Sequence, residues 1–157
     1  MTERGTPETG AEFDLEAFLP FILNQTAEVI GKSFQAHYRA AYGMTRTQWR
    51  VLAIVGRYGG LTASDICAIA HEEKSRVSRA VAALEERGML SREISPEDKR
   101  AEILSLSAEG AETYRVLGQA ALAFDQALRD RLGPEAETQL RDLLQRLRSV
   151  TGGAEKG

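Results

Sequence analysis

The sequence predicts a mainly helical fold with one small β-hairpin, and three observations support this prediction. Apolar residues recur at spacings of three, four and seven along most of the chain, as they do on one face of a helix. Gly, Pro, Ser and Thr stand where these patterns begin and end. Between residues 89 and 106 the pattern changes to the alternation of strands around a polar tip that contains Pro.

The composition is that of one compact folded unit. The chain has 157 residues, of which 43% are hydrophobic and 27% charged, and this is typical of globular proteins. No apolar run approaches the roughly 18 residues of a membrane span, so we expect no membrane partner. The polar first residues do not resemble a secretory signal, and the one cysteine, Cys67, cannot form an internal disulfide, so we expect a cytoplasmic protein. One Cys and two His residues favour neither a metal site nor a cofactor.

A long first helix is expected over residues 13–43, after a mobile tail at residues 1–12 that contains Gly and Pro. Its apolar positions are Phe13, Leu15, Phe18, Leu19, Ile22, Val29, Ile30, Phe34 and Tyr38. Because Pro20 lies early in this pattern, the helix either starts near Pro20 or is kinked there.

The central region, residues 44–106, is expected to contain three helices and the hairpin. Residues 45–48 (TRTQ) have the spacing of a capping box, so the second helix starts there and ends at Gly59-Gly60. Thr62 or Ser64 caps a short third helix. The fourth helix, residues 74–87, follows a tight connection and ends at Gly88. The third and fourth helices therefore have the form of a helix-turn-helix.

Two more helices are expected after the hairpin. Ser107 caps the first of them, and Gly133-Pro134 separates it from the last, which ends near residue 151 before a second tail at residues 152–157. Their apolar positions are Tyr114, Leu117, Ala121, Phe124, Leu128, Leu132, Leu140, Leu143, Leu144, Leu147 and Val150. The central region is too small to cover these stripes and that of the first helix. We therefore expect a homodimer, with dimerisation helices at residues 13–43 and 107–151.

The fourth helix has one apolar and one polar side. Advancing 100° per residue places Val77, Val81 and Leu84 on the inner side. Ser75, Arg76, Ser78 and Arg79 then lie outward. An α-helix fits the major groove of DNA, where Arg pairs with guanine and Ser reaches bases or phosphates. The alternative is the solvated face of an ordinary helix.

The tip of the hairpin carries Asp98, Lys99 and Arg100. A cation on a protruding loop can enter the electronegative minor groove, while Asp98 is expected to hold a nearby Arg through a charge-assisted hydrogen bond. The charge distribution agrees with a polyanion-binding role, since residues 74–100 carry +2 and the rest of the chain −5, within a total of −3. A hairpin without a nucleic-acid role is the alternative.

These residues resemble the MarR-type winged helix-turn-helix regulators, over nearly all of residues 13–150. The motifs that carry the resemblance are residues 47–52 (TQWRVL), 75–79 (SRVSR), 84–88 (LEERG), 98–100 (DKR) and 104–107 (LSLS), with Gly110. Ser107 stands where the family usually has Thr, which keeps the capping chemistry. The resemblance implies a winged helix-turn-helix flanked by terminal dimerisation helices, in homodimers that bind palindromic operators as repressors released by a ligand.

We therefore expect a regulator that binds duplex DNA, with its two recognition helices about 34 Å apart, one DNA turn. Thr62 and Ser64 would position the third helix on phosphate. The candidate DNA-binding residues are Thr62, Ser64, Lys74, Ser75, Arg76, Ser78, Arg79, Arg92, Asp98, Lys99 and Arg100. An alternative is a helical dimerisation or protein-interaction module whose winged domain no longer binds DNA specifically. An enzyme is not expected, because the sequence has no phosphate loop, nucleophile elbow or metal cluster.

Aromatic and polar residues at the junction of the first two helices suggest an effector site. The candidates are Phe34, His37, Tyr38, Arg46, Trp49 and Arg50, for which core packing is the alternative. Residues 18–38 and 49–51 are similar to regulators of aromatic-acid catabolism, including those that respond to hydroxycinnamoyl-CoA, so an aromatic acid or its CoA thioester is the expected ligand. Some relatives sense peroxide with a cysteine, but Cys67 lies between Ile66 and Ile69 and is expected to be a small buried hydrophobe.

Overall fold

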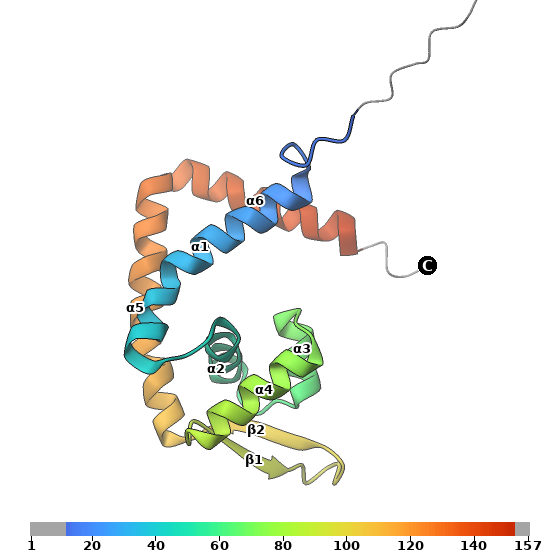
Figure 1. The fold of residues 1–157 in the computed structure, drawn as a ribbon, viewed down its shortest axis with the longest axis vertical. Helices are drawn as coiled ribbons and strands as arrows, with labels where there is room; N and C mark the ends of the chain where they lie inside the picture. Colours follow the sequence, from blue (N-terminus) through green and yellow to red (C-terminus); the bar gives the residue numbers. More distant parts are fainter. Residues whose placement is uncertain (1–11, 153–157) are drawn as a thin grey trace, which may run out of the picture. The chain divides into compact units, whose positions relative to one another are not determined.

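The computed structural model describes residues 12–152, and the chain divides into two compact units, residues 1–36 and 37–157. The tails expected at residues 1–12 and 152–157 lie outside the described residues, apart from Glu12 and Gly152. The predicted fold class, mainly helical with one hairpin, is confirmed (Figure 1). The elements are α1 (Leu19–Tyr42), α2 (Arg46–Tyr58), α3 (Ala63–Ala70), α4 (Lys74–Glu86), β1 (Leu90–Ile94), β2 (Glu102–Leu106), α5 (Ala108–Leu132) and α6 (Pro134–Gly152).

The first helix begins later than residue 13, where the apolar pattern placed its start. Residues 15–17 form a turn, and α1 starts at Leu19 with Pro20 in its first turn. The Ile22 amide donates to the Phe18 carbonyl at 3.1 Å, which is the first helical hydrogen bond. Pro20 decides the start, because the first turn is where its missing N–H removes no helical hydrogen bond.

The core of the second unit lies among α2, α3, α4 and the hairpin. Its largest fully buried side chains include Leu52, Ile66, Leu84, Leu104, Val51, Val55, Val77 and Val81. Each stabilises the fold by roughly 1.5–3 kcal/mol relative to full exposure. The capping box at the start of α2 is present, since Thr45 Oγ1 accepts from the Gln48 amide at 3.2 Å and Gln48 Oε1 from the Thr45 amide at 3.2 Å. This packing holds α4 with one side against the core (Figure 1).

The hairpin is antiparallel, with Leu90 opposite Leu106 and Ile94 opposite Glu102. A third segment that the sequence pattern did not indicate joins its base. Leu61 pairs with Leu104 through two backbone hydrogen bonds of 3.0 and 2.8 Å. The stretch between α2 and α3 is thereby attached to the hairpin, so hairpin and helix-turn-helix form one body.

Helix α5 starts at Ser107, as expected, and is seated directly on the base of the hairpin. Ser107 Oγ accepts from the Gly110 amide at 3.0 Å and donates to the Gly88 carbonyl. Gly110 packs so closely that a Cβ there would lie 2.0 Å from the Met89 carbonyl oxygen. Gly133, at φ 84°, ends α5, and α6 follows with none of its side chains buried. Within residues 12–152, no helix combines the length and the apolar character that a membrane span requires.

Candidate nucleic-acid interface

The polar side of α4 is exposed as the sequence predicted. Ser75, Arg76, Ser78 and Arg79 are all exposed, while Val77 on the opposite side is 0% exposed. Arg79 Nε donates to the Ser75 carbonyl at 3.3 Å, which lays part of its guanidinium along the helix. The first two turns of α4 therefore present two hydroxyls and two guanidinium groups with no acid among them, a combination suited to base edges and phosphates in a major groove.

The tip of the hairpin is an ordered loop with its cations outward. The Ser95 amide donates to the Ala101 carbonyl at 2.8 Å, and Ser95 Oγ accepts from the Asp98 amide at 3.3 Å. Asp98 Oδ1 accepts from the backbone amide of Arg100 at 3.0 Å, and not from a guanidinium as expected. The carboxylate therefore shapes the loop, which leaves the Lys99 and Arg100 side chains exposed.

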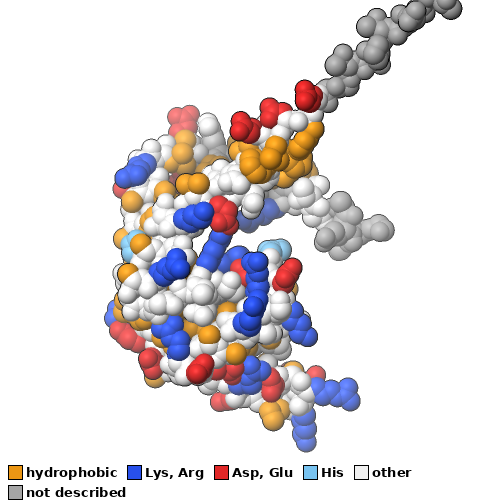
Figure 2. Space-filling model, in the orientation of Figure 1, with side chains coloured by type: hydrophobic (Ala, Val, Ile, Leu, Met, Phe, Trp, Pro, Cys, Tyr) orange, Lys and Arg blue, Asp and Glu red, His pale blue; other side chains and the backbone are white. Residues whose placement is uncertain are grey.

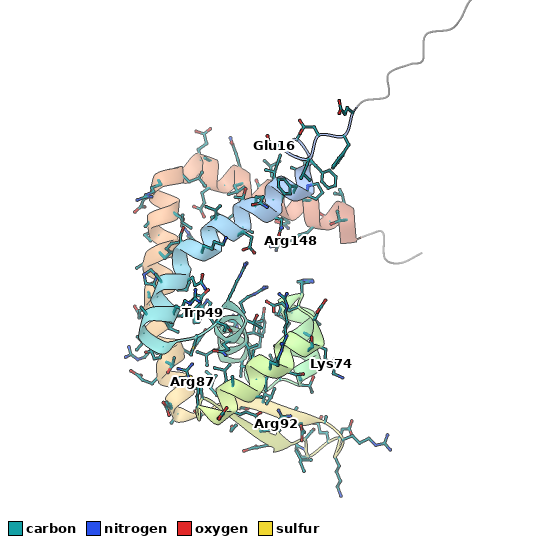
Figure 3. The ribbon with its side chains drawn as sticks, in the orientation of Figure 1. Glu16, Trp49, Lys74, Arg87, Arg92 and Arg148 are labelled. Carbon is teal, nitrogen blue, oxygen red and sulfur yellow. The ribbon has the colours of Figure 1, made fainter. Side chains whose placement is uncertain are left out.

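Arg92 connects the hairpin to α4. Its Nε and Nη2 lie 2.8 and 2.9 Å from the two Glu85 carboxylate oxygens, and Nη1 contacts Glu102. The hydrogen bonds from Arg92 lower the pKa of Glu85, and those carboxylates in turn raise the pKa of Arg92. Figure 3 shows this side chain between the hairpin and α4. Arg92, which the sequence placed among the DNA contacts, is an exposed side chain whose guanidinium is paired with two carboxylates, and it links the hairpin to α4.

Of the two hydroxyls expected at the start of α3, only one is the cap. Thr62 Oγ1 accepts from the Asp65 amide at 3.1 Å and donates to Asp65 Oδ2 at 2.7 Å. The hydrogen bond from the Thr62 hydroxyl, and after it the one that the Thr62 backbone amide donates to Asp65 Oδ2 at 3.0 Å, lower the pKa of Asp65. Ser64 lies in the first turn and is exposed, so its hydroxyl is available to a ligand while that of Thr62 is used by the fold.

A hollow of about 540 Å³ joins α3, the start of α4 and the hairpin. Lys74, Arg92 and Arg100 bring three cations to it, with the hydroxyls of Thr62 and Ser64. Cys67, expected to be a small buried hydrophobe, also lines this hollow and is only half-buried. Figure 2 shows Lys and Arg side chains gathered over α4 and at the free end of the hairpin. Five of the sequence-predicted DNA-binding residues thus line this hollow, namely Thr62, Ser64, Lys74, Arg92 and Arg100, while Arg76 and Arg79 line another one beside the start of α2.

The predicted effector residues do not gather in one pocket. A second hollow of about 540 Å³ lies between α2 and α5, and of those six residues only Trp49 lines it. Its other walls come from Ala53, Tyr114, Arg115, Gly118, Gln119, Ala121, Leu122 and Asp125. Apart from Ala53, which lies one turn after Trp49 in α2, the sequence missed these residues because they follow the hairpin, far from Trp49 in the chain.

The other effector candidates are placed elsewhere. Tyr38 stacks on Trp49 with ring centroids 6.1 Å apart, and burial raises its pKa. His37 meets the ring of Phe124 edge-on at 6.3 Å. Arg50 is engaged with residues at the end of α3, as described below. Arg46 lies in the first turn of α2, and Phe34 belongs to the first unit. Of the six candidates, Trp49 therefore lines the hollow between α2 and α5, with its aromatic ring on the α2 side.

Comparisons with known proteins agree with this arrangement. The family model described as "MarR family" matches residues 42–101, which include the helix-turn-helix, β1 and the tip of the hairpin but not β2. An uncharacterised HTH-type transcriptional regulator, YwoH of Bacillus subtilis (strain 168), is 29% identical over 106 residues, covering 68% of this chain and 76% of that protein.

Solved structures extend the similarity to most of the chain. A probable transcriptional regulator from Pseudomonas aeruginosa is similar with a TM-score of 0.73 and 26% identity, over 85% of this chain and 99% of that one. The structure of NadR in complex with 4-hydroxyphenylacetate is similar with a TM-score of 0.76 and 25% identity, over 87% of this chain and 99% of that one. The similarity therefore includes the terminal helices as well as the helix-turn-helix.

Proposed function

We propose that the chain, whose residues 42–101 match the MarR family model, is a cytoplasmic DNA-binding transcriptional repressor of this type, which binds a palindromic operator as a homodimer and is released by a small molecule. The exposed side of α4 carries the proposal. Ser75, Ser78 and Arg79 read bases or phosphates in the major groove, while Arg76 and Lys74 contact the DNA backbone beside them. From here on we call residues 89–106 the wing; its tip places Lys99 and Arg100 in or near the adjacent minor groove.

Homodimer formation is supported by the apolar surface of α6. None of its side chains is buried, and Leu140, Leu143 and Val150 are 45, 53 and 73% exposed. Large apolar side chains repeated along one helix are stabilised when a second copy covers them. A two-fold axis through such an interface gives each recognition helix its own half-site. Binding at one half-site therefore increases the affinity at the other.

Release by a ligand is supported by the hollow between α2 and α5. Apolar walls from Trp49, Ala53 and Leu122 with a few polar groups suit a small aromatic molecule. NadR, a structural relative, binds 4-hydroxyphenylacetate, which belongs to this chemical class. An aromatic carboxylic acid or its CoA thioester is therefore the proposed effector. Its binding would raise the melting temperature of the protein, and an unchanged melting temperature across a panel of such compounds would contradict this part of the proposal.

DNA binding is tested by selecting a preferred duplex from a random pool and measuring variants on it by fluorescence anisotropy. Arg79→Ala is expected to lose about 1–3 kcal/mol of binding free energy and to relax one base preference. Lys99→Ala is expected to weaken binding to all duplexes alike and to reduce the salt slope by about one unit per half-site.

Arg131→Ala is the control, because Arg131 is an exposed cation in the last turn of α5, far along the chain from the proposed interface. It removes the same charge and is expected to leave base preference unchanged. If Arg79→Ala and Lys99→Ala both bind like the wild type, the assigned side of α4 is wrong. If the wild type selects no duplex and binds only non-specifically, the chain is instead a dimerisation or protein-interaction module.

A further inference from the structure

The turn between α3 and α4 contains a nearly buried carboxylate that α2 holds on both oxygens. Glu72 is 12% exposed at its side chain; its Oε1 lies 2.8 Å from Arg50 Nη1, and its Oε2 accepts from Thr47 Oγ1 at 3.0 Å. Arg50 Nη2 also donates to the carbonyl of Ala70, the last residue of α3, at 2.7 Å. We call Thr47, Arg50 and Glu72 the α2 clamp, because together they attach α2 to the turn that precedes the recognition helix.

The start of α4 is held by the burial of Val77 on its inner side, but it has no side-chain cap. Its N-cap residue, Glu73, makes no side-chain capping hydrogen bond. The preceding turn passes through His71 at φ 51°, a left-handed conformation that is uncommon for a residue other than Gly. A helix start without its own cap depends on contacts from neighbouring elements for its direction. The α2 clamp is such a contact, and it acts one residue before the cap.

The same end of α2 faces the DNA-binding side of α4. The side chains of Thr45, Thr47 and Gln48 share a hollow of about 340 Å³ with Arg76 and Arg79. Below this hollow the two helices are in contact, and Val77 and Ala80 of α4 are buried, so the polar side chains at its edge lie on the solvent side of the packed interface. A polar link at the edge of this hollow therefore has a direct effect on where the two guanidinium groups lie.

We propose that Glu72 is a positioning residue for DNA recognition, which acts through Arg50 and Thr47 to set the direction of the first two turns of α4. The inference rests on the proposed DNA-binding function. A positioning role of Glu72 and a purely electrostatic role predict changes of opposite sign in DNA affinity when Glu72 is removed. Removing an acid beside a surface that binds a polyanion strengthens binding if only charge matters, whereas releasing the helix start weakens binding to the preferred duplex.

The test compares Glu72→Ala with Glu73→Ala, two adjacent substitutions that remove the same charge. Circular dichroism at the assay temperature first establishes that each variant is folded. Glu72→Ala is expected to lose about tenfold in affinity for the preferred duplex, with little change on an unrelated duplex. Glu73→Ala is expected to bind both duplexes at least as tightly as the wild type. If Glu72→Ala also binds the preferred duplex as well as the wild type does, the proposal is overturned.

Two further variants test the geometry. Glu72→Gln keeps the shape of the side chain; its amide oxygen can still accept from Arg50 Nη1 and its NH2 group can donate to Thr47 Oγ1. This variant is therefore expected to recover most of the affinity and the same preferred duplex. Arg50→Lys keeps the charge but loses the fork that joins Glu72 to Ala70, so it is expected to lose preference for the duplex. Should Glu72→Ala not fold, Arg50→Lys decides, and wild-type preference in that variant would overturn the proposal.

A measurement without DNA separates this inference from the proposed function. Hydrogen exchange of the backbone amides in residues 74–80 is expected to be faster in Glu72→Ala than in Glu73→Ala, while exchange in the middle of α2 stays the same. If the wild type prefers no duplex, the proposed function fails. The exchange comparison alone then shows whether the α2 clamp holds the start of α4. Equal exchange in the two variants would show that Glu72 does not hold the start of α4.

Discussion

Because α5 approaches the base of the wing closely at Gly110, adding one methyl group there is expected to lower the unfolding free energy strongly. A Cβ at Gly110 would lie 2.0 Å from the Met89 carbonyl oxygen and 3.2 Å from its Cα, so the backbone must move for Gly110→Ala to fold. The same carbonyl accepts the Ser107 amide at 3.0 Å, at the start of α5. Overpacking costs about 1–3 kcal/mol, and disturbing this hydrogen bond adds about 1 kcal/mol. We expect a loss of about 3 kcal/mol in unfolding free energy.

Gly118→Ala is the matched control. It lies in the same helix and a Cβ there meets nothing within 4 Å, so the better helix propensity of Ala is expected to add about 0.5–1 kcal/mol. The two variants should therefore differ by about 4 kcal/mol, or nearly a thousandfold in the folding equilibrium. Urea denaturation followed by circular dichroism, at one protein concentration and with comparable m-values, measures this difference. If Gly110→Ala unfolds within about 0.5 kcal/mol of the wild type, α5 does not sit on the wing as described.

Two other predictions concern the caps and the wing attachment. Thr62→Ala should cost about 1 kcal/mol of stability in urea denaturation by removing the α3 cap. Ser64→Ala should leave urea stability unchanged and weaken DNA binding. The reverse pattern would show that the two residues have exchanged roles. Because Arg92 lowers the pKa of Glu85 in the folded protein, their pairing stabilises the fold above the usual carboxyl pKa and is lost as pH falls through the lower folded value. Urea midpoints of Glu85→Gln should therefore fall less steeply than those of the wild type between about pH 5 and pH 3, and identical slopes would contradict this pairing.

Local sequence signals were sufficient for the helix-turn-helix. The caps at Thr45 and Ser107 depend only on residues three positions apart, and both are present. The buried side of α4 follows from helical periodicity, and Val77, Val81 and Leu84 are all at most 2% exposed. These features were predictable because a cap or a helical stripe is determined within one or two turns of chain.

Features that depend on distant residues were not predictable in the same way. Nothing in the sequence distinguishes Arg50, which is bound to Glu72, from an arginine at the mouth of an effector site. Arg92 likewise looks like a DNA contact until Glu85 and Glu102 are seen beside it. Lys and Arg are alike in sequence whether their charge is neutralised by a neighbour or offered to a ligand, so only the folded arrangement separates the two cases.

This distinction explains how a chain with a net charge of −3 can present a DNA-binding surface. Arg50 and Arg92 are paired with carboxylates and hold the interface together, while Arg76, Lys99 and Arg100 are exposed on it. Beyond the Debye length of about 8–10 Å, these charges are screened and the acidic total gives DNA little attraction. At contact distance the exposed cations dominate the electrostatic interaction with DNA. In the proposed homodimer, an acidic protein arranged in this way would gain affinity mainly after both recognition helices are in register, which would favour a specific operator over random DNA.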